Sequence, residues 1–270
     1  MAKINLDKYY TDIEIAKSCI RKTYDIIGLD NITEIIEPSA GNGSFSNLIN
    51  GYSNYFKGCI SYDIEPEQKN IIKQDFLKLH LPYKKGRLFI GNPPFGEKNL
   101  LAMKFYKHCV MMGDYIAFIL PISQYNNNQQ MFEFDLIYSE DLGMKTYTDR
   151  DLHCCFNIYR RPESGEYNPK PQTRLKDISI YRQDSNGYRE RDFDLRMCYW
   201  GDGTAGKILK DGENYSAEYK IKINNDNIKN KIIETLTYFN WKEYLNCIAM
   251  RKIQQFHIVD VLRKAIPEIT

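Results

Sequence analysis

The stretch IIEPSAGNGSF, residues 35–45, decides the fold that the sequence predicts. A short apolar strand is expected to end near Pro38, the glycines Gly41 and Gly43 follow, and an apolar helix begins after Phe45. Glycines between a strand and a helix let the backbone approach a ligand closely, as in doubly wound α/β folds that bind nucleotides. The third glycine of the dinucleotide spacing is missing, so the pattern disfavours a dinucleotide.

Two acidic residues follow this segment at positions that suit a nucleoside. The strand-like run 58–62 ends at Asp63, and an acid at the tip of a second strand can bind the two hydroxyls of a ribose. Asp75 lies further along the chain and could accept a hydrogen bond from an adenine amino group, while Phe76 could cover the adenine face. Either acid taken alone could be a solvated loop residue.

The tetrapeptide NPPF, residues 92–95, suits the binding of a planar amino group. The side-chain oxygen of Asn92 and the carbonyl of Pro93 can both accept hydrogen bonds from one NH2 group, because the prolines restrict the backbone. Phe95 can stack on the ring that carries the amine. The apolar run 87–91 precedes the motif, so a proline turn that ends a buried strand is the structural alternative.

These motifs, in this order, resemble the S-adenosylmethionine-dependent N6-adenine DNA methyltransferase family of the NPPF type, in which the cofactor motifs precede the catalytic motif. The resemblance extends from Lys8 to about Arg161 and includes KYYTDIEIA, residues 8–16, as the amino-terminal cofactor motif. Asp12 stands where the family has proline, and a short acid can also begin a helix. The implied fold is the α/β, Rossmann-like class I methyltransferase fold, with a doubly wound, mostly parallel sheet.

The resemblance also implies functional residues and S-adenosyl-L-methionine as the cofactor. The implied catalytic residues are Asn92, Pro93, Pro94 and Phe95. The implied cofactor-binding residues are Tyr10, Thr11, Glu37, Pro38, Ala40, Gly41, Gly43, Phe45, Asp63, Ile64, Asp75 and Phe76. Together they predict a site-specific enzyme that methylates a flipped adenine in DNA.

Downstream of the catalytic motif, the pattern predicts a helix over residues 100–110, a fully buried parallel strand over 114–121 and a late strand over 152–160. In the family, such a late strand supplies an aromatic that stacks on the target base. Phe156 and Tyr159 are the candidates, and alternation puts them on opposite faces, so at most one can serve. We favour Phe156.

A boundary is expected where proline, glycine and polar residues replace regular apolar spacing, over residues 162–171. We predict a catalytic domain over residues 1–165 and a small α+β target-recognition region over 166–270, with strands near 177–181 and 219–223 and a helix over 228–239.

Three cations are candidates for contact with nucleic acid: Arg160, Arg161 and Lys207. Lys207 ends a stretch, 201–207, that matches the glycine and lysine spacing of a phosphate loop. Ile208 stands where Ser or Thr should hold magnesium, so we favour contact with a nucleic-acid phosphate over a nucleotide site.

Composition indicates a cytoplasmic protein with no membrane partner, because no apolar run reaches the length of a membrane span. Seven cysteines without spaced pairs favour reduced thiols. The cluster His153-Cys154-Cys155 lacks a second ligand pair, so we expect no metal. The net charge of +2 permits a nucleic-acid surface without indicating one.

Several alternatives stay open. The same catalytic motif serves enzymes that methylate adenine in structured RNA, including ribosomal RNA, and a close variant serves protein-glutamine methyltransferases. Phe95 favours adenine, because tyrosine commonly follows the prolines in the glutamine enzymes. A non-catalytic nucleic-acid-binding subunit of a modification complex is the alternative of another class. A restriction nuclease or a partner subunit could accompany the protein in each case.

Overall fold

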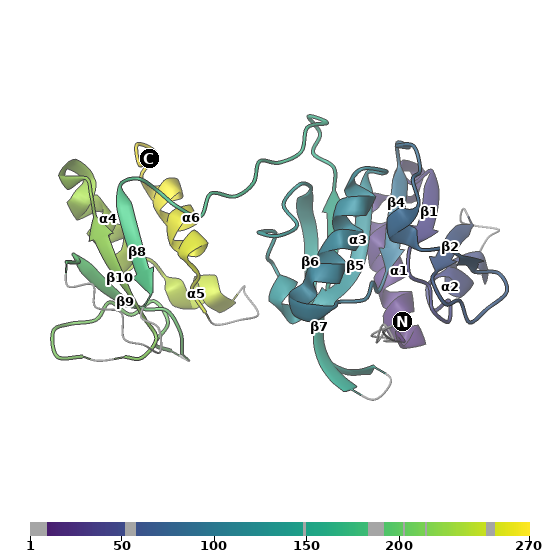
Figure 1. Ribbon diagram of the computed structural model, residues 1–270, viewed down its shortest axis with the longest axis horizontal. Helices are drawn as coiled ribbons and strands as arrows, with labels where there is room; N and C mark the ends of the chain where they lie inside the picture. Colours follow the sequence, from purple (N-terminus) through teal and green to yellow (C-terminus); the bar gives the residue numbers. More distant parts are fainter. Residues whose placement is uncertain are drawn as a thin grey trace. The chain divides into compact units, whose positions relative to one another are not determined.

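The computed structural model describes residues 10–51, 58–147, 150–182, 192–201, 203–213, 215–246 and 252–270. Its internal contacts divide the chain into two units, unit 1 (Met1–Lys170) and unit 2 (Pro171–Thr270), and each is described by itself. Figure 1 shows the elements of both units. The division lies within the proline-rich stretch 162–171.

Unit 1 contains a seven-stranded sheet with the order β3-β2-β1-β4-β5-β7-β6. The strands are β1 (Glu34–Glu37), β2 (Cys59–Asp63), β3 (Ile72–Lys73), β4 (Arg87–Gly91), β5 (Tyr115–Pro121), β6 (Asp135–Tyr147) and β7 (Arg150–Arg160). The first five are parallel, and β7 runs antiparallel to both β5 and β6. The strand order reverses between β1 and β4, where α/β sheets place their ligands. The predicted α/β, Rossmann-like fold with a doubly wound, mostly parallel sheet is thereby confirmed.

Helices cover both faces of this sheet. They are α1 (Ile13–Ile27), α2 (Ser46–Gly51) and α3 (Leu100–Val110), with the short 3-10 helices η1 (Leu29–Asn31), η2 (Phe76–Lys78), η3 (Glu97–Asn99) and η4 (Ile122–Gln124). On one face, Lys22 of α1 donates a hydrogen bond to Tyr138 of β6, which lies opposite Ile158 of β7 in the sheet. On the other face, Tyr106 of α3 contacts the ring of Tyr159, the residue after Ile158. Adjacent strand residues point to opposite faces, so α1 and α3 lie on opposite sides.

Local chemistry explains why these segments adopt these structures. Asp12 begins α1, because its side chain accepts hydrogen bonds from the amides of Glu14 and Ile15. Residues Ile116 to Leu120 of β5 have no exposed surface, as expected of a strand covered on both faces. The predicted helix over 100–110 coincides with α3.

Unit 2 is a small α+β structure. Its strands β8 (Ile178–Arg182), β9 (Leu195–Cys198) and β10 (Glu218–Ile223) form an antiparallel sheet with the order β8-β10-β9. Its helices are η5 (Asp226–Ile228), α4 (Lys229–Tyr238), α5 (Trp241–Asn246) and α6 (Gln255–Ala265). Buried side chains such as Ile221, Ile232 and Leu262 form a core separate from that of unit 1.

No helix in the part of the chain that the structure describes is long and apolar enough to cross a membrane. His153 pairs with Asp141 at 2.7 Å, and Cys154 and Cys155 are buried. Among the described residues, His, Cys, Asp and Glu side chains do not gather in a group that could hold a metal ion.

Candidate active site

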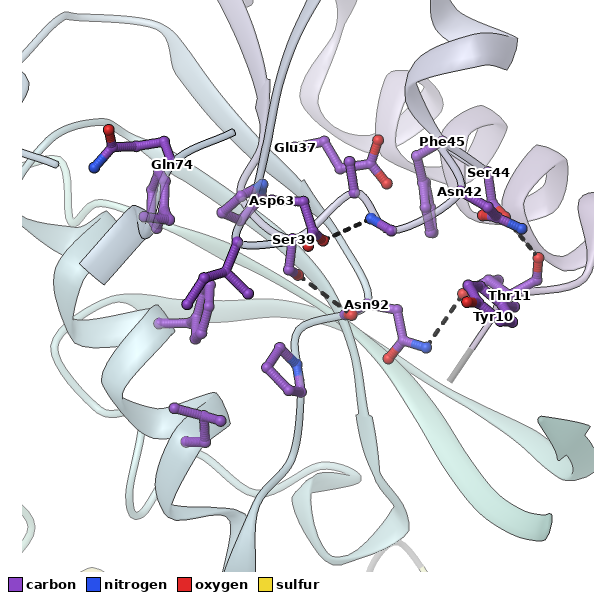
Figure 2. Close-up of a pocket in the computed structure, with 18 of the residues that line it drawn as sticks. Tyr10, Thr11, Glu37, Ser39, Asn42, Ser44, Phe45, Asp63, Gln74 and Asn92 are labelled. Carbon is purple, nitrogen blue, oxygen red and sulfur yellow. Dashed lines mark hydrogen bonds between the residues drawn. The ribbon is translucent and has the colours of Figure 1, made fainter. Parts of the chain in front are cut away.

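A pocket in unit 1 lies at the carboxyl ends of β1, β2 and β4, and Figure 2 shows most of its lining. Its lining residues are Tyr10, Thr11, Glu37, Pro38, Ser39, Ala40, Gly41, Asn42, Ser44, Phe45, Asp63, Ile64, Gln74, Asp75, Phe76, Leu77, Asn92, Pro94, Leu101 and Phe105. The pocket therefore brings together every cofactor-binding residue predicted from the sequence except Gly43, together with Asn92 and Pro94 of the catalytic motif.

Glu37 lies at the start of the glycine segment, residues 38–45, which joins β1 to α2. Its side chain is 2% exposed, and Oε2 accepts a hydrogen bond from the amide of Ser46 at 2.9 Å, at the first residue of α2. Burial raises the pKa of Glu37 to about 8, although the amides of Ser46 and Phe45 favour its charged form. This carboxyl group thus ties the end of β1 to the helix that follows the glycines.

Asp63 fixes the other side of the glycine segment. Its carboxylate accepts hydrogen bonds from the amide of Gly41 at 2.7 Å and from the amide of Glu65 at 2.8 Å (Figure 2 shows the first). Gly41 has a φ of 53°, which favours glycine. A carboxylate has lone pairs left after two such bonds, so Asp63 can still accept from ligand hydroxyls.

Gly43 has a different role from the one predicted. It does not line the pocket, and a Cβ atom there would lie 2.8 Å from the side chain of Asn47 in α2. Its φ is 79°, a backbone conformation that favours glycine, whereas the Asn47 side chain could move aside for a Cβ atom. Gly43 therefore shapes the turn into α2 rather than the ligand surface.

Aromatic rings form the wall beside Asp75. Phe76 is 2% exposed and stacks on Phe105 of α3, with ring centroids 5.9 Å apart and an interplanar angle of 8°. Asp75 caps η2 by accepting from the amide of Leu77 at 3.1 Å. The arrangement offers an apolar surface next to a carboxylate, which suits a planar ring that carries an amino group.

Asn92 follows β4 and is held from two sides. Its side-chain nitrogen donates to the hydroxyl of Thr11 at 3.2 Å, and its backbone carbonyl accepts from the hydroxyl of Ser39 at 3.4 Å (Figure 2). Pro94 lines the pocket, whereas Pro93 is buried. The pocket thus combines the carboxylates of Asp63 and Asp75 with the side-chain amide of Asn92.

Three aromatic residues that the sequence predicts to contact the target base lie away from the pocket lining. Phe95 is 8% exposed and packs in the core, while its carbonyl accepts hydrogen bonds from the first turn of α3. Phe156 and Tyr159 have no exposed surface and belong to the same core. None of the three lines the pocket.

Arg161, which the sequence suggested as a contact for nucleic acid, has a structural role instead. Its guanidinium bonds Asp114 at 3.0 Å and the carbonyl oxygens of Val110 and Gly113, and its side chain is 14% exposed. It also lies over the rings of Tyr83, Phe134 and Tyr167. A cation with these partners has no free face for a phosphate.

Arg160 and Lys207 keep exposed side chains, so contact with nucleic acid stays a prediction for both. Lys207 pairs with Glu213 at 2.6 Å, and any phosphate must compete with that carboxylate. The stretch 201–207 lacks the context of a phosphate loop, because Ile208 bridges to Met197 of β9 instead of beginning a helix.

The sequence prediction missed seven lining residues: Ser39, Asn42, Ser44, Gln74, Leu77, Leu101 and Phe105. The three polar ones from Ser39 to Ser44 lie inside the glycine segment itself, so proximity in sequence could have found them. Leu101 and Phe105 are four residues apart on the predicted helix, and this spacing puts both on one face. Which face meets the pocket depends on tertiary packing.

Comparison with known proteins gives similarities in fold only. No family model matches the sequence, and no curated protein matches it. Among solved structures, a candidate RNA methyltransferase, PH1948 of Pyrococcus horikoshii, is 13% identical, with 60% of this chain and 90% of that chain covered and a TM-score of 0.48.

Two further similar structures are methyltransferases by name. A candidate class I S-adenosylmethionine-dependent enzyme of Listeria monocytogenes is 14% identical, with 63% of this chain and 65% of that chain covered and a TM-score of 0.47. The magnesium protoporphyrin IX methyltransferase of Synechocystis, with bound S-adenosylmethionine, is 13% identical, with 56% and 79% covered and a TM-score of 0.40.

Proposed function

We propose that the chain is an S-adenosylmethionine-dependent methyltransferase that methylates the N6 amine of a flipped adenine in duplex DNA. One observation carries the proposal: a single pocket is lined both by Gly41 and the acids that suit a nucleoside and by Asn92 and Pro94 of the catalytic motif. A methyl donor and an amine acceptor must meet in one place, and this pocket provides that place.

The residues of the pocket fit the proposed cofactor. Asp63 would hold the ribose hydroxyls, Asp75 the adenine amino group, and the apolar surface of Phe76 the adenine ring. Gly41 allows the backbone to approach the ligand closely. When bound, S-adenosylmethionine supplies an already activated methyl group, so the protein's task is binding and orientation.

The proposed role of Asn92 is to hold the target amine. Its side-chain oxygen and the carbonyl of Pro93 accept hydrogen bonds from the two amino hydrogens, which turns the nitrogen lone pair toward the methyl group. The adenine must first leave its stack, at a cost of about a few kcal/mol. Base stacking is not assigned to Phe95, Phe156 or Tyr159, because none of the three lines the pocket.

The test is methyl transfer from radiolabelled S-adenosylmethionine to unmethylated duplex DNA, single-stranded DNA and structured RNA, followed by digestion to nucleosides. We expect N6-methyladenine in DNA. The control is Asn92→Ala, which should lower turnover by roughly 1,000-fold or more while changing cofactor affinity by less than about threefold, because the amide acts on the amine.

Other outcomes redirect or end the proposal. Label in RNA alone would assign an RNA adenine methyltransferase. Absence of cofactor binding in calorimetry would favour a non-catalytic nucleic-acid-binding subunit. Cofactor binding without label on any substrate would indicate that a partner subunit completes the DNA surface, and adding cell extract would then restore transfer.

A further inference from the structure

The hydrogen bond between Thr11 and Asn92 joins two motifs that are far apart in the sequence. Thr11 precedes the cap of α1, and Asn92 follows β4. The amide nitrogen of Asn92 lies 3.2 Å from the Thr11 hydroxyl oxygen, and Figure 2 shows that nitrogen directed at Thr11. Thr11 is 7% exposed, and the bond is partly buried beside the pocket.

The backbone of Thr11 is held by contacts on both sides. Its carbonyl accepts a hydrogen bond from the hydroxyl of Ser44 at 2.9 Å, which fixes it to the glycine segment. The next residue, Asp12, accepts hydrogen bonds from the amides of Glu14 and Ile15 and so fixes it to α1. The backbone of Thr11 is therefore held between the glycine segment and α1, and from there its hydroxyl meets the Asn92 side chain.

An asparagine amide has two ends of similar shape and opposite hydrogen-bonding character. Rotation by 180° about its last bond exchanges the oxygen, which accepts, with the NH2 group, which donates. The target amine needs an acceptor, because both of its hydrogens must be held. A flipped Asn92 would oppose one NH2 group with another and leave the target amine unheld.

We propose that Thr11 is a positioning residue that fixes the Asn92 amide with its oxygen toward the target amine. The inference rests on the proposed function. The amide nitrogen is bound by the Thr11 hydroxyl, so the oxygen of the same planar group is directed away from Thr11.

The direction of the Thr11 hydroxyl proton makes this arrangement selective. A hydroxyl can accept or donate, so in isolation it tolerates both amide orientations. Thr11 lines the pocket, so its proton can go to an acceptor on a bound ligand. Once the hydroxyl donates to the ligand, it can only accept from Asn92. Binding of the cofactor would thus set the amide in the productive orientation before the adenine arrives.

The first test compares Thr11→Val, which keeps the shape and removes the hydroxyl, with Thr11→Ser, which keeps the hydroxyl. At saturating cofactor, we expect Thr11→Val to lower kcat roughly tenfold, the range expected for one hydrogen bond, and Thr11→Ser to restore kcat to within about twofold. A loss that saturating cofactor fully corrects would overturn the positioning role, because it would place Thr11 in cofactor binding alone.

The second test introduces Thr11→Val into a protein that already carries Asn92→Asp. A carboxylate presents an acceptor whichever way it is turned, so it needs no residue to set its orientation. We expect Thr11→Val to change the residual kcat of Asn92→Asp by less than about twofold. A full tenfold loss in that background would show that Thr11 acts through the fold or the cofactor, and would overturn the proposal.

A third measurement does not depend on turnover. In protein labelled with 15N-asparagine, the side-chain amide signals of Asn92 are identified by their absence in Asn92→Ala. We expect these signals to shift and to exchange faster in Thr11→Val than in the wild type and Thr11→Ser. Unchanged signals would overturn the proposal even in an inactive protein. Shifted signals without methyl transfer would instead locate the failure in the proposed function.

Discussion

Each unit has a segment with glycines beside its sheet, but the glycines of the two segments have different roles. In unit 1, Gly41 turns its amide to Asp63 and opens onto the pocket, and α2 follows. In unit 2, a Cβ atom on Gly206 would lie 2.3 Å from the side chain of Trp241, so this glycine permits close packing. A helix follows the glycines of unit 1, of which Gly41 lines the candidate ligand site. In unit 2 the next structure is the β-bridge of Ile208 to Met197, and the glycine there serves packing.

The same contrast holds for the cations. Arg161 and Lys207 look alike as candidates for phosphate contact in the sequence. Arg161 in unit 1 is enclosed by a carboxylate, two carbonyl groups and three rings, while Lys207 in unit 2 is exposed beside Glu213. A basic residue thus reveals its role only through its partners.

The largest expected effect separates these two cations. Arg161→Ala should lower the free energy of unfolding by about 3 kcal/mol, because it removes the ion pair with the Asp114 carboxylate, which keeps its hydrogen bonds from the Tyr83 hydroxyl and the Gly86 amide. Lys207→Ala should have little measurable effect, because its ion pair is exposed. Urea unfolding followed by circular dichroism measures both. Equal losses in the two variants would remove the contrast between a structural and a surface cation.

The next effect concerns the glycine segments. Asp63→Ala should weaken cofactor binding by roughly 10- to 100-fold, because it removes charged hydrogen bonds to the Gly41 amide and to the ligand. Gly206→Ala should leave cofactor affinity unchanged while destabilising the protein, since its glycine serves packing against Trp241. Calorimetric titration with S-adenosylmethionine checks both. Weaker binding in Gly206→Ala would mean that the segment in unit 2 also contacts the ligand.

Much of the fold could be predicted because its signals are local. The apolar run of β5, the cap of α1 at Asp12 and the glycine turn after β1 each depend on neighbours in the sequence. β6 was missed because it is an edge strand with two register shifts, at Leu136/Tyr138 and Asp141/Gly143, which break the alternation of side chains. Helix α6 was missed as well, although its buried residues Ile258, Val261 and Leu262 recur at helical spacing in the sequence.

In the candidate site, too, some residues could be predicted from the sequence and others could not. Motif order predicted that Asp63, Asp75 and Asn92 would meet, and the pocket brings them together. The roles of aromatic residues could not be predicted, because burial depends on the helices that cover the sheet. Phe156 and Phe95 satisfy the sequence pattern for base stacking, yet both are enclosed in the core.

A smaller effect distinguishes the units by pH. Glu37 has a pKa of about 8 in the folded protein, against 4.5 as the ordinary value. Between these values the folded state binds more protons, so stability falls as pH rises from about 4.5 to 8. Glu37→Gln should remove this decline, on the order of 2 kcal/mol after relaxation of the buried site. Urea unfolding without ligand at pH 5, 6.5 and 8 measures it. Parallel curves for variant and wild type would show that Glu37 is ionised throughout.

The smallest effect has the opposite sign and belongs to unit 2. Burial lowers the pKa of His257 to about 4, from an ordinary value of 6.5. Its Nδ1 atom accepts a hydrogen bond from the amide of Gln254 at the start of α6, which requires an unprotonated nitrogen. Between pH 6.5 and 4 the unfolded state binds more protons, so unit 2 should lose stability as pH falls.

His257→Gln isolates this effect, because glutamine at the third helical position can keep the cap and cannot take up a proton. Both tryptophans, Trp200 and Trp241, lie in unit 2, so their fluorescence reports its unfolding alone. We expect the variant to match the wild type at pH 7.5 and to exceed it by on the order of 1 kcal/mol at pH 4.5. A constant difference across this range would assign the acid sensitivity to another group. With Glu37 weakening unit 1 at high pH and His257 weakening unit 2 at low pH, the stability of unit 1 relative to unit 2 should decrease as the pH rises from about 4.5 to 8.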